Sequence, residues 1–136
     1  MKPLVLDTNI VLDCFVFADE AARSVRTALE AGSARWLATA DMRSELERVL
    51  AYPKIAPRLA YYGIEAADVL ALFDRHAQLV EAPARASVRC SDPDDQKFVD
   101  LALAHGAALL SKDAAVLALR KRLAARDVLA APALTE

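Results

Sequence analysis

Two carboxylates follow short apolar runs near the two ends of the chain. Asp7 comes directly after residues 4–6, and Asp113 comes shortly after residues 107–110. Aliphatic runs of this length without alternation are typical of parallel strands that are covered on both faces. In open α/β sheets, ligands bind beyond the carboxyl ends of such strands. The two aspartates are therefore candidates for one site at the edge of a sheet.

Two further carboxylates, Glu45 and Asp95, fall on the apolar faces of predicted helices. Glu45 follows Met42 by three residues, and Asp95 precedes Phe98 by three and Val99 by four. Spacings of three and four residues place side chains on one helix face. A carboxylate turned toward apolar neighbours is costly unless a cation or hydrogen-bond donors meet it. Both acids therefore need a partner that their own helix face does not supply.

Each acid also has an ordinary structural interpretation. Asp7 begins an Asp-Thr-Asn sequence, and these residue types are favoured helix caps. The run 91–95 contains candidate caps, and its acids are favoured near a helix N-terminus by the helix dipole. Glu45 could form an ion pair with an arginine such as Arg43 or Arg48. No one of these acids, taken alone, distinguishes a site from a cap or an ion pair.

The remaining pattern alternates short apolar runs with amphipathic helices, which predicts an α/β fold in one domain, residues 1–136. Gly32 and Thr39 are candidate helix ends, as a C-terminal and an N-terminal cap respectively. The predicted strands lie near residues 4–6, 36–38, 78–80, 107–110 and 128–130. The predicted helices lie near residues 19–31, 40–51, 57–62 and 65–76, from residue 93 onward, and near 114–124.

Composition limits the class of protein. The chain has 136 residues, 56% of them hydrophobic, and a net charge of −2, so nucleic-acid binding would have to rest on a local basic patch. We expect no membrane segment and no signal peptide, which predicts a cytoplasmic protein. Cys14 and Cys90 match no metal-binding spacing and are expected to be free thiols.

If the strands are parallel, all four carboxylates can converge at one edge of the sheet. Their mutual repulsion would raise their pKa values and destabilise the fold unless cations neutralise them. Ligands that are all oxygen, without His or Cys, indicate Mg²⁺ or Mn²⁺ rather than zinc. Such a site can hydrolyse phosphodiesters by polarising a phosphoryl oxygen and activating water. The sequence offers no Ser-His or Cys-His nucleophile arrangement and no glycine-rich phosphate loop.

The sequence resembles the PIN-domain family in four motifs that together cover nearly the whole chain. They are Leu-Asp-Thr-Asn near the N-terminus, a helical glutamate, Asp-Pro-Asp-Asp-Gln-Lys-Phe, and Ser-Lys-Asp after a late strand. The resemblance implies a three-layer α/β/α domain with a mostly parallel sheet. It further implies a nuclease site whose acidic stations are Asp7, Glu45, Asp95 and Asp113, with Asn9 and Ser111 as supporting polar residues.

The nearest likeness is to the toxin ribonucleases of bacterial toxin–antitoxin systems. It implies a metal-dependent endoribonuclease that cleaves single-stranded RNA, acts as a homodimer and is inhibited by a protein antitoxin. Arg43, Lys97 and Lys112 are cations near the motifs that could position the phosphate backbone. Lys112 occupies a position that usually carries a small residue in the family, and it could instead replace part of a metal's charge. Val16 and Phe17 are expected to be exposed apolar contacts for a partner.

Three other functions share some of these residues. A catalytically silent module would keep the fold and only bind RNA or protein. A receiver-like signalling domain also gathers aspartates and a lysine, but it needs an acidic pair where this chain has Asp7 and Thr8. A phosphatase with an Asp-x-Asp motif would need an acid at Asn9. Within residues 92–95, helical phase favours Asp95 as the metal ligand, because Asp94 is rotated about 100° from it.

Overall fold

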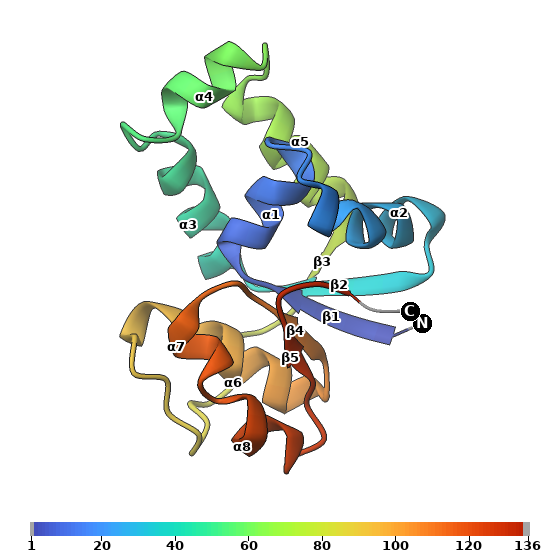
Figure 1. The fold of residues 1–136 in the computed structure, drawn as a ribbon, viewed down its shortest axis with the longest axis vertical. Helices are drawn as coiled ribbons and strands as arrows, with labels where there is room; N and C mark the ends of the chain where they lie inside the picture. The colour runs from blue at the N-terminus through green and yellow to red at the C-terminus, as the bar shows by residue number, and fades with distance from the viewer. Residues whose placement is uncertain (1, 135–136) are drawn as a thin grey trace.

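A five-stranded, all-parallel sheet forms the centre of the computed structural model, which describes residues 2–134 (Figure 1). The order across the sheet is β3-β2-β1-β4-β5. The chain is thus mixed α/β, as the alternation of apolar runs and helices predicts. The strands are β1 (Lys2–Leu6), β2 (Ala34–Ala38), β3 (Ala77–Leu79), β4 (Ala108–Leu110) and β5 (Ala130–Ala131).

The middle strand, β1, is the most enclosed part of the sheet. Leu4 pairs with Trp36 on β2 and with Ala108 on β4. Leu4 and Val5 have no exposed surface, because helices cover both faces. The backbone N–H of Asp7 donates to the carbonyl of Leu110 at 3.0 Å, which fixes the end of β1 beside the end of β4. The register of the central strands therefore brings two chain segments far apart in sequence to the same edge.

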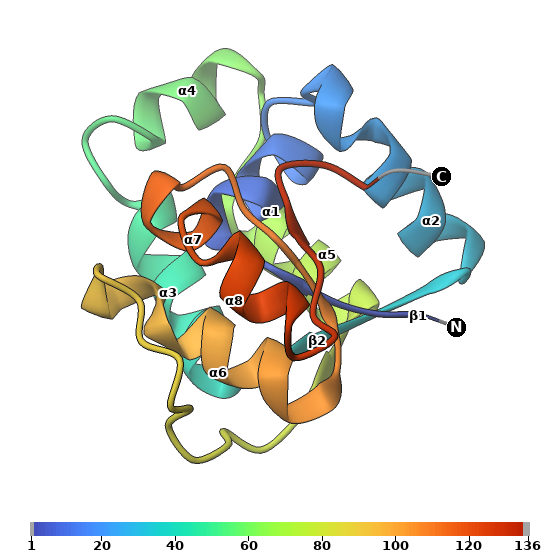
Figure 2. The same ribbon diagram turned by 60° about the horizontal axis from the view of Figure 1, so that its bottom comes forward.

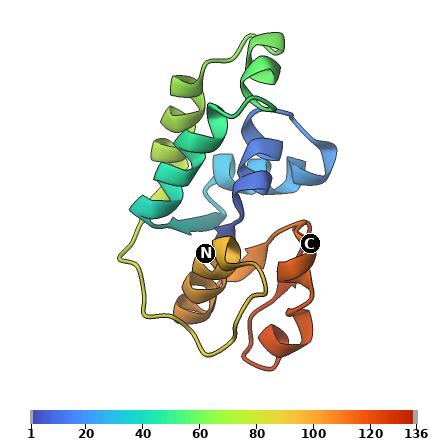
Figure 3. The same cartoon turned by 90° about the vertical axis from the view of Figure 1, so that its left-hand side faces the viewer.

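Helices lie on both faces of the sheet, in three layers (Figures 1 and 3). The first five α-helices gather on one face and the last three on the other; Figure 2 shows the latter group from below. The α-helices are α1 (Thr8–Phe15), α2 (Arg23–Ala31), α3 (Ala40–Leu50), α4 (Ala56–Tyr61), α5 (Ala66–His76), α6 (Gln96–His105), α7 (Ala114–Leu117) and α8 (Arg120–Ala124). Two 3-10 turns, η1 (Glu20–Ala22) and η2 (Pro93–Asp95), precede α2 and α6.

Two predicted helix ends are present. The Thr39 side chain accepts a hydrogen bond from the Met42 N–H at 3.3 Å and begins α3. Gly32 ends α2 with φ of 72°, a left-handed conformation that glycine adopts without a steric penalty. Local chemistry therefore determines where these helices begin and end.

Two predictions were wrong, one about a helix and one about an exposed side chain. The helix predicted at 114–124 is two short helices, because the backbone leaves helical geometry at Leu119, with ψ of 2°. This break keeps Val116, Leu119 and Leu123 all buried. Val16, predicted to be exposed, is only 3% exposed, whereas Phe17 is partly buried. The reason is that the chain turns back after α1, so that Val16 packs into the core.

The long irregular segment between β3 and η2 is held by the start of α6. The Gln96 amide donates to the carbonyl of Val88 at 2.9 Å and accepts from the Cys90 N–H at 2.6 Å. Asp100, one turn later, accepts from the Ala86 N–H at 2.8 Å. These contacts fix the approach of the chain to η2 and so the position of Asp95.

Within residues 2–134, no helix combines the length and hydrophobicity that crossing a bilayer requires. Both cysteines are free thiols, as expected, and Cys14 is buried.

Candidate metal centre

Asp7 lies at the junction of β1 and α1 and is 4% exposed. One carboxylate oxygen accepts from the Asn9 N–H at 3.0 Å, which makes Asp7 the N-cap of α1. The other oxygen accepts from the Ser111 hydroxyl at 2.6 Å. Asp7 can therefore be both a helix cap and part of a site, since capping uses only one of its two oxygens.

Asp113 is placed by the end of β4 in the same manner. Its N–H donates to the Ser111 hydroxyl oxygen at 3.0 Å, and its carboxylate accepts from the Ala115 N–H at 2.9 Å as the cap of α7. Ser111 has no exposed surface and connects Asp7 to Asp113. A buried serine thus links the two aspartates that follow β1 and β4.

Asp95 comes to the same place from the turn η2. It is 8% exposed, whereas its neighbour Asp94 is exposed. Asp92 caps the turn by accepting from the Asp94 N–H at 3.0 Å. One oxygen of Asp95, Oδ2, is buried without a hydrogen-bond partner among the described residues. Helical phase thus correctly predicted that Asp95 is buried and Asp94 exposed. Of the two candidate caps before Pro93, Ser91 and Asp92, the structure uses Asp92.

The three aspartates form a compact group, the aspartate triad (Asp7, Asp95 and Asp113). One carboxylate oxygen from each lies within 4.8 Å of the others. Burial, and then the neighbouring Asp113 and Asp7, raises the pKa of Asp95 to about 7. Burial also raises the pKa of Asp7, although the hydrogen bonds from Ser111 and Asn9 oppose this. The charge of the triad is therefore poorly compensated within the protein.

An unpaired buried carboxylate oxygen beside two more carboxylates fits a divalent cation. No ion pair among the described residues joins the triad to a lysine or arginine. The donors are all oxygen, as Mg²⁺ and Mn²⁺ prefer. The sequence prediction of four converging acids is met by three of them.

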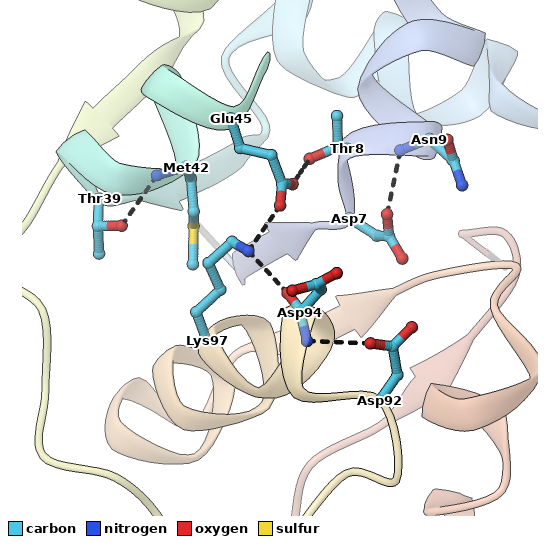
Figure 4. A network of polar contacts seen from close by, with 9 residues as sticks. All are labelled: Asp7, Thr8, Asn9, Thr39, Met42, Glu45, Asp92, Asp94 and Lys97. Carbon is cyan, nitrogen blue, oxygen red and sulfur yellow. Dashed lines mark hydrogen bonds and ion pairs between the residues drawn. The ribbon is translucent and has the colours of Figure 1, made fainter. Parts of the chain in front are cut away.

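Glu45 has a different environment (Figure 4). Its carboxylate accepts a hydrogen bond from the Thr8 hydroxyl and lies 2.6 Å from the Lys97 ammonium. Lys97 also donates to the backbone carbonyl of Asp94 at 2.6 Å. An ion pair was one of the two interpretations of Glu45, but its partner is a lysine of α6 rather than Arg43 or Arg48. Glu45 therefore lies beside the triad as a carboxylate whose charge is balanced by Lys97.

The other two predicted cations are also engaged. Arg43 binds both oxygens of Asp74 on α5, at 2.7 and 2.9 Å, so it turns to a neighbouring helix rather than to the triad. Lys112 lies 2.5 Å from Asp13, whose side chain is 8% exposed. The sequence reasoning missed Asp13 and Thr8. The available signal for Asp13 was a lone acid within the apolar run that follows Asp7.

A protein-family model described as "PIN domain" matches residues 3–115 of the chain. The matched segment contains the whole triad and Glu45. No curated protein sequence matches the chain.

Proposed function

Because the chain belongs to the PIN-domain family, whose members are generally nucleases, we propose that it is a metal-dependent endoribonuclease that cleaves single-stranded RNA. The observation that carries the proposal is the aspartate triad, with its three carboxylates within 4.8 Å and one buried oxygen unpaired. A structural ion-pair network would have supplied cations to these groups, as it does for Glu45.

In this proposal Asp7, Asp95 and Asp113 hold Mg²⁺ or Mn²⁺. When bound, such an ion polarises the phosphoryl oxygen and lowers the pKa of water to make a nucleophile. Ser111 and the Asn9 N–H hold the Asp7 carboxylate in place, and the caps of α1 and α7 keep Asp7 and Asp113 from rotating. The protein thus presents preformed ligands whose orientation does not depend on the substrate.

Glu45 and Lys97 have supporting roles in this proposal. Lys97 holds Glu45 by an ion pair and would contact a phosphate of the bound strand. Its ammonium has three donors, two of which are used by Glu45 and by the Asp94 carbonyl. Lys112, whose charge is paired with Asp13, would line the path of the strand next to Asp113. Arg43 has no substrate role in this proposal, since its Nε and one terminal nitrogen donate to the two oxygens of Asp74.

The test is cleavage of end-labelled single-stranded RNA in Mn²⁺, compared with EDTA and with Asp7→Asn. We expect metal-dependent internal cleavage by the natural chain and none by the variant. A folded protein that binds RNA but does not cut it in any divalent metal would indicate the silent binding module instead. Duplex RNA and single-stranded DNA serve as competitors that measure substrate preference.

We further propose that the protein is the toxin of a toxin–antitoxin pair and acts in the cytoplasm as a homodimer. This rests on the likeness of its motifs to toxin ribonucleases. Induced expression should arrest growth, whereas Asp7→Asn should not, and co-expression of an adjacent small DNA-binding protein should restore growth. A monomer by light scattering, or harmless expression of an active nuclease, would contradict this role.

A further inference from the structure

A pocket of about 380 Å³ lies beside the triad, on the side of α1 and α4. Asn9 and Lys112 line it, and each is within two residues of a triad aspartate in the sequence. Pockets that hold small ligands usually have volumes of several hundred Å³. A strand bound at the triad would therefore have this hollow next to it. Its lining includes Asn9, Leu12, Phe17, Ile55, Arg58 and Lys112.

The chemistry of the pocket suits a flat, uncharged ring better than a phosphate. Its cations, Arg58 and Lys112, are offset by Asp13 and Asp19, and Lys112 is already paired with Asp13. A phosphate would meet no net positive charge there. The walls formed by Leu12 and Ile55 are apolar, as the face of a nucleobase requires.

Arg58 supplies a platform on which such a ring can stack. Its guanidinium carbon lies 3.8 Å from the centre of the Phe17 ring, a cation–π contact that restrains the side chain. Guanidinium planes stack on the bases of unpaired RNA, and a restrained plane loses less entropy when a base binds. The exposed Asn9 can offer both a donor and an acceptor to a base edge. The pocket thus combines a stacking surface with one adaptable polar group.

We propose that this pocket binds one nucleobase of single-stranded RNA adjacent to the phosphate held at the triad, with Arg58 as its stacking residue. The inference rests on the proposed ribonuclease function and adds a subsite to it. The base pocket makes Arg58 a determinant of substrate affinity and of preference among bases, while the triad supplies the chemistry.

The experiment measures binding of fluorescent homopolymeric RNAs, about ten nucleotides long, to the Asp95→Asn protein, which leaves the strand uncut. An abasic ribose-phosphate strand of the same length keeps the charges and lacks the bases. Arg58→Ala and Arg58→Lys are compared with Arg35→Ala, which removes an exposed arginine from the opposite end of the sheet, near the start of β2. Melting curves establish that each variant is folded.

We expect Arg58→Ala to weaken binding of at least one homopolymer about tenfold, the usual effect of losing a stacked base. Arg58→Lys should lose nearly as much, because it keeps the charge and lacks the plane. Neither change should alter binding of the abasic strand beyond the small effect of Arg35→Ala. In the cutting protein, Arg58→Ala should raise KM more than it lowers kcat.

Full rescue by Arg58→Lys, or an equal loss on the abasic strand, would show a purely electrostatic contact and overturn the base pocket. Unchanged binding in all Arg58 variants would also overturn it, and would leave the hollow to some other ligand, such as a protein segment. Because the binding measurement needs no cleavage, failure of the ribonuclease assay alone would reject the proposed function without deciding the pocket.

Discussion

Two acidic regions lie side by side at the carboxyl edge of the sheet, and they are compensated in different ways. Glu45 receives a hydroxyl from Thr8 and an ammonium from Lys97. Within residues 2–134, the aspartate triad receives only neutral donors, from Ser111 and from backbone amides, and one buried oxygen of Asp95 has no partner. The two regions contain the same functional group, and only one of them has its charge balanced by the protein.

This difference distinguishes a carboxylate held in an ion pair from carboxylates that have room for a cation. Buried charges are normally paired, because an unpaired buried charge loses its hydration, which costs on the order of several kcal/mol. Among the described residues, the three aspartates have no lysine or arginine partner, so the fold is less stable than it could be unless a cation binds there. The Glu45 region shows that the same fold can place a lysine where one is needed.

The largest expected effect is on catalysis. Asp95→Asn keeps the shape and removes a charge from the triad, so it should lower Mn²⁺-dependent RNA cleavage on the order of 10³-fold, since bound metal supplies several kcal/mol to such reactions. The matched control is Asp94→Asn, whose side chain is exposed, and which should stay active. An inactive Asp94→Asn together with an active Asp95→Asn would show that Asp94, and not Asp95, belongs to the metal site.

Metal addition should stabilise the protein through the triad. Mn²⁺ at a hundred times its Kd should add about 2.7 kcal/mol to the free energy of unfolding, which for a chain of this size raises Tm by roughly 8 °C. The effect should be lost in Asp95→Asn and kept in Asp94→Asn, as measured by melting curves and by calorimetric titration of metal. Equal shifts in both variants would locate the cation elsewhere.

Without metal, the triad should make stability depend on pH. The pKa of Asp95 is about 7 in the folded protein and lower in the unfolded chain, so the folded state binds protons more readily. The free energy of unfolding should therefore fall as pH rises from about 4 to about 7. Asp95→Asn should be about 1 to 2 kcal/mol more stable than the natural chain at pH 8, after allowance for solvent screening, and equally stable near pH 4.

The measurement is urea unfolding in EDTA across that range, with Asp94→Asn as the control that should follow the natural chain. A natural chain that becomes more stable between pH 5 and pH 8, relative to Asp95→Asn, would mean that the triad is compensated after all.

Breaking the Glu45–Lys97 pair should make the second region resemble the first. Lys97→Met leaves Glu45 without its cation, and a double-mutant cycle with Glu45→Gln should give a coupling of about 1 to 2 kcal/mol for this partly buried pair. Mn²⁺ should then stabilise Lys97→Met more than it stabilises the natural chain, because another carboxylate is left unneutralised. A coupling near zero would show that Lys97 is not the charge partner of Glu45 in solution.

The smallest expected effect concerns the cap beside the triad. Asp92→Ala removes the hydrogen bond to the Asp94 N–H and should cost about 1 kcal/mol of stability, with cleavage retained. Urea unfolding and the cleavage assay measure the two effects separately. Loss of cleavage at unchanged stability would assign Asp92 a direct part in the site.

The sequence by itself determined the approximate positions of the strands, the helix ends at Gly32 and Thr39, and the acids at the strand ends. It did not predict the helix α1, which follows Asp7 directly. Short apolar runs such as 4–6 specify covered parallel strands, and caps such as Thr39 act within a few residues, so both can be predicted from local pattern. The placement of Asp95 on the buried side of its turn also followed, since helical phase depends only on spacing. These properties are local, which is why one sequence sufficed.

Only the tertiary structure decided how each acid is compensated. Lys97 lies 52 residues after Glu45, and Ser111 lies 104 residues after Asp7, so no spacing rule relates them. Arg43 looked available from its position near Glu45, yet Asp74 on a neighbouring helix binds it. Whether a carboxylate is a ligand or an ion-pair partner depends on charges brought close by folding, because electrostatic interactions follow distance in space and burial rather than order along the chain.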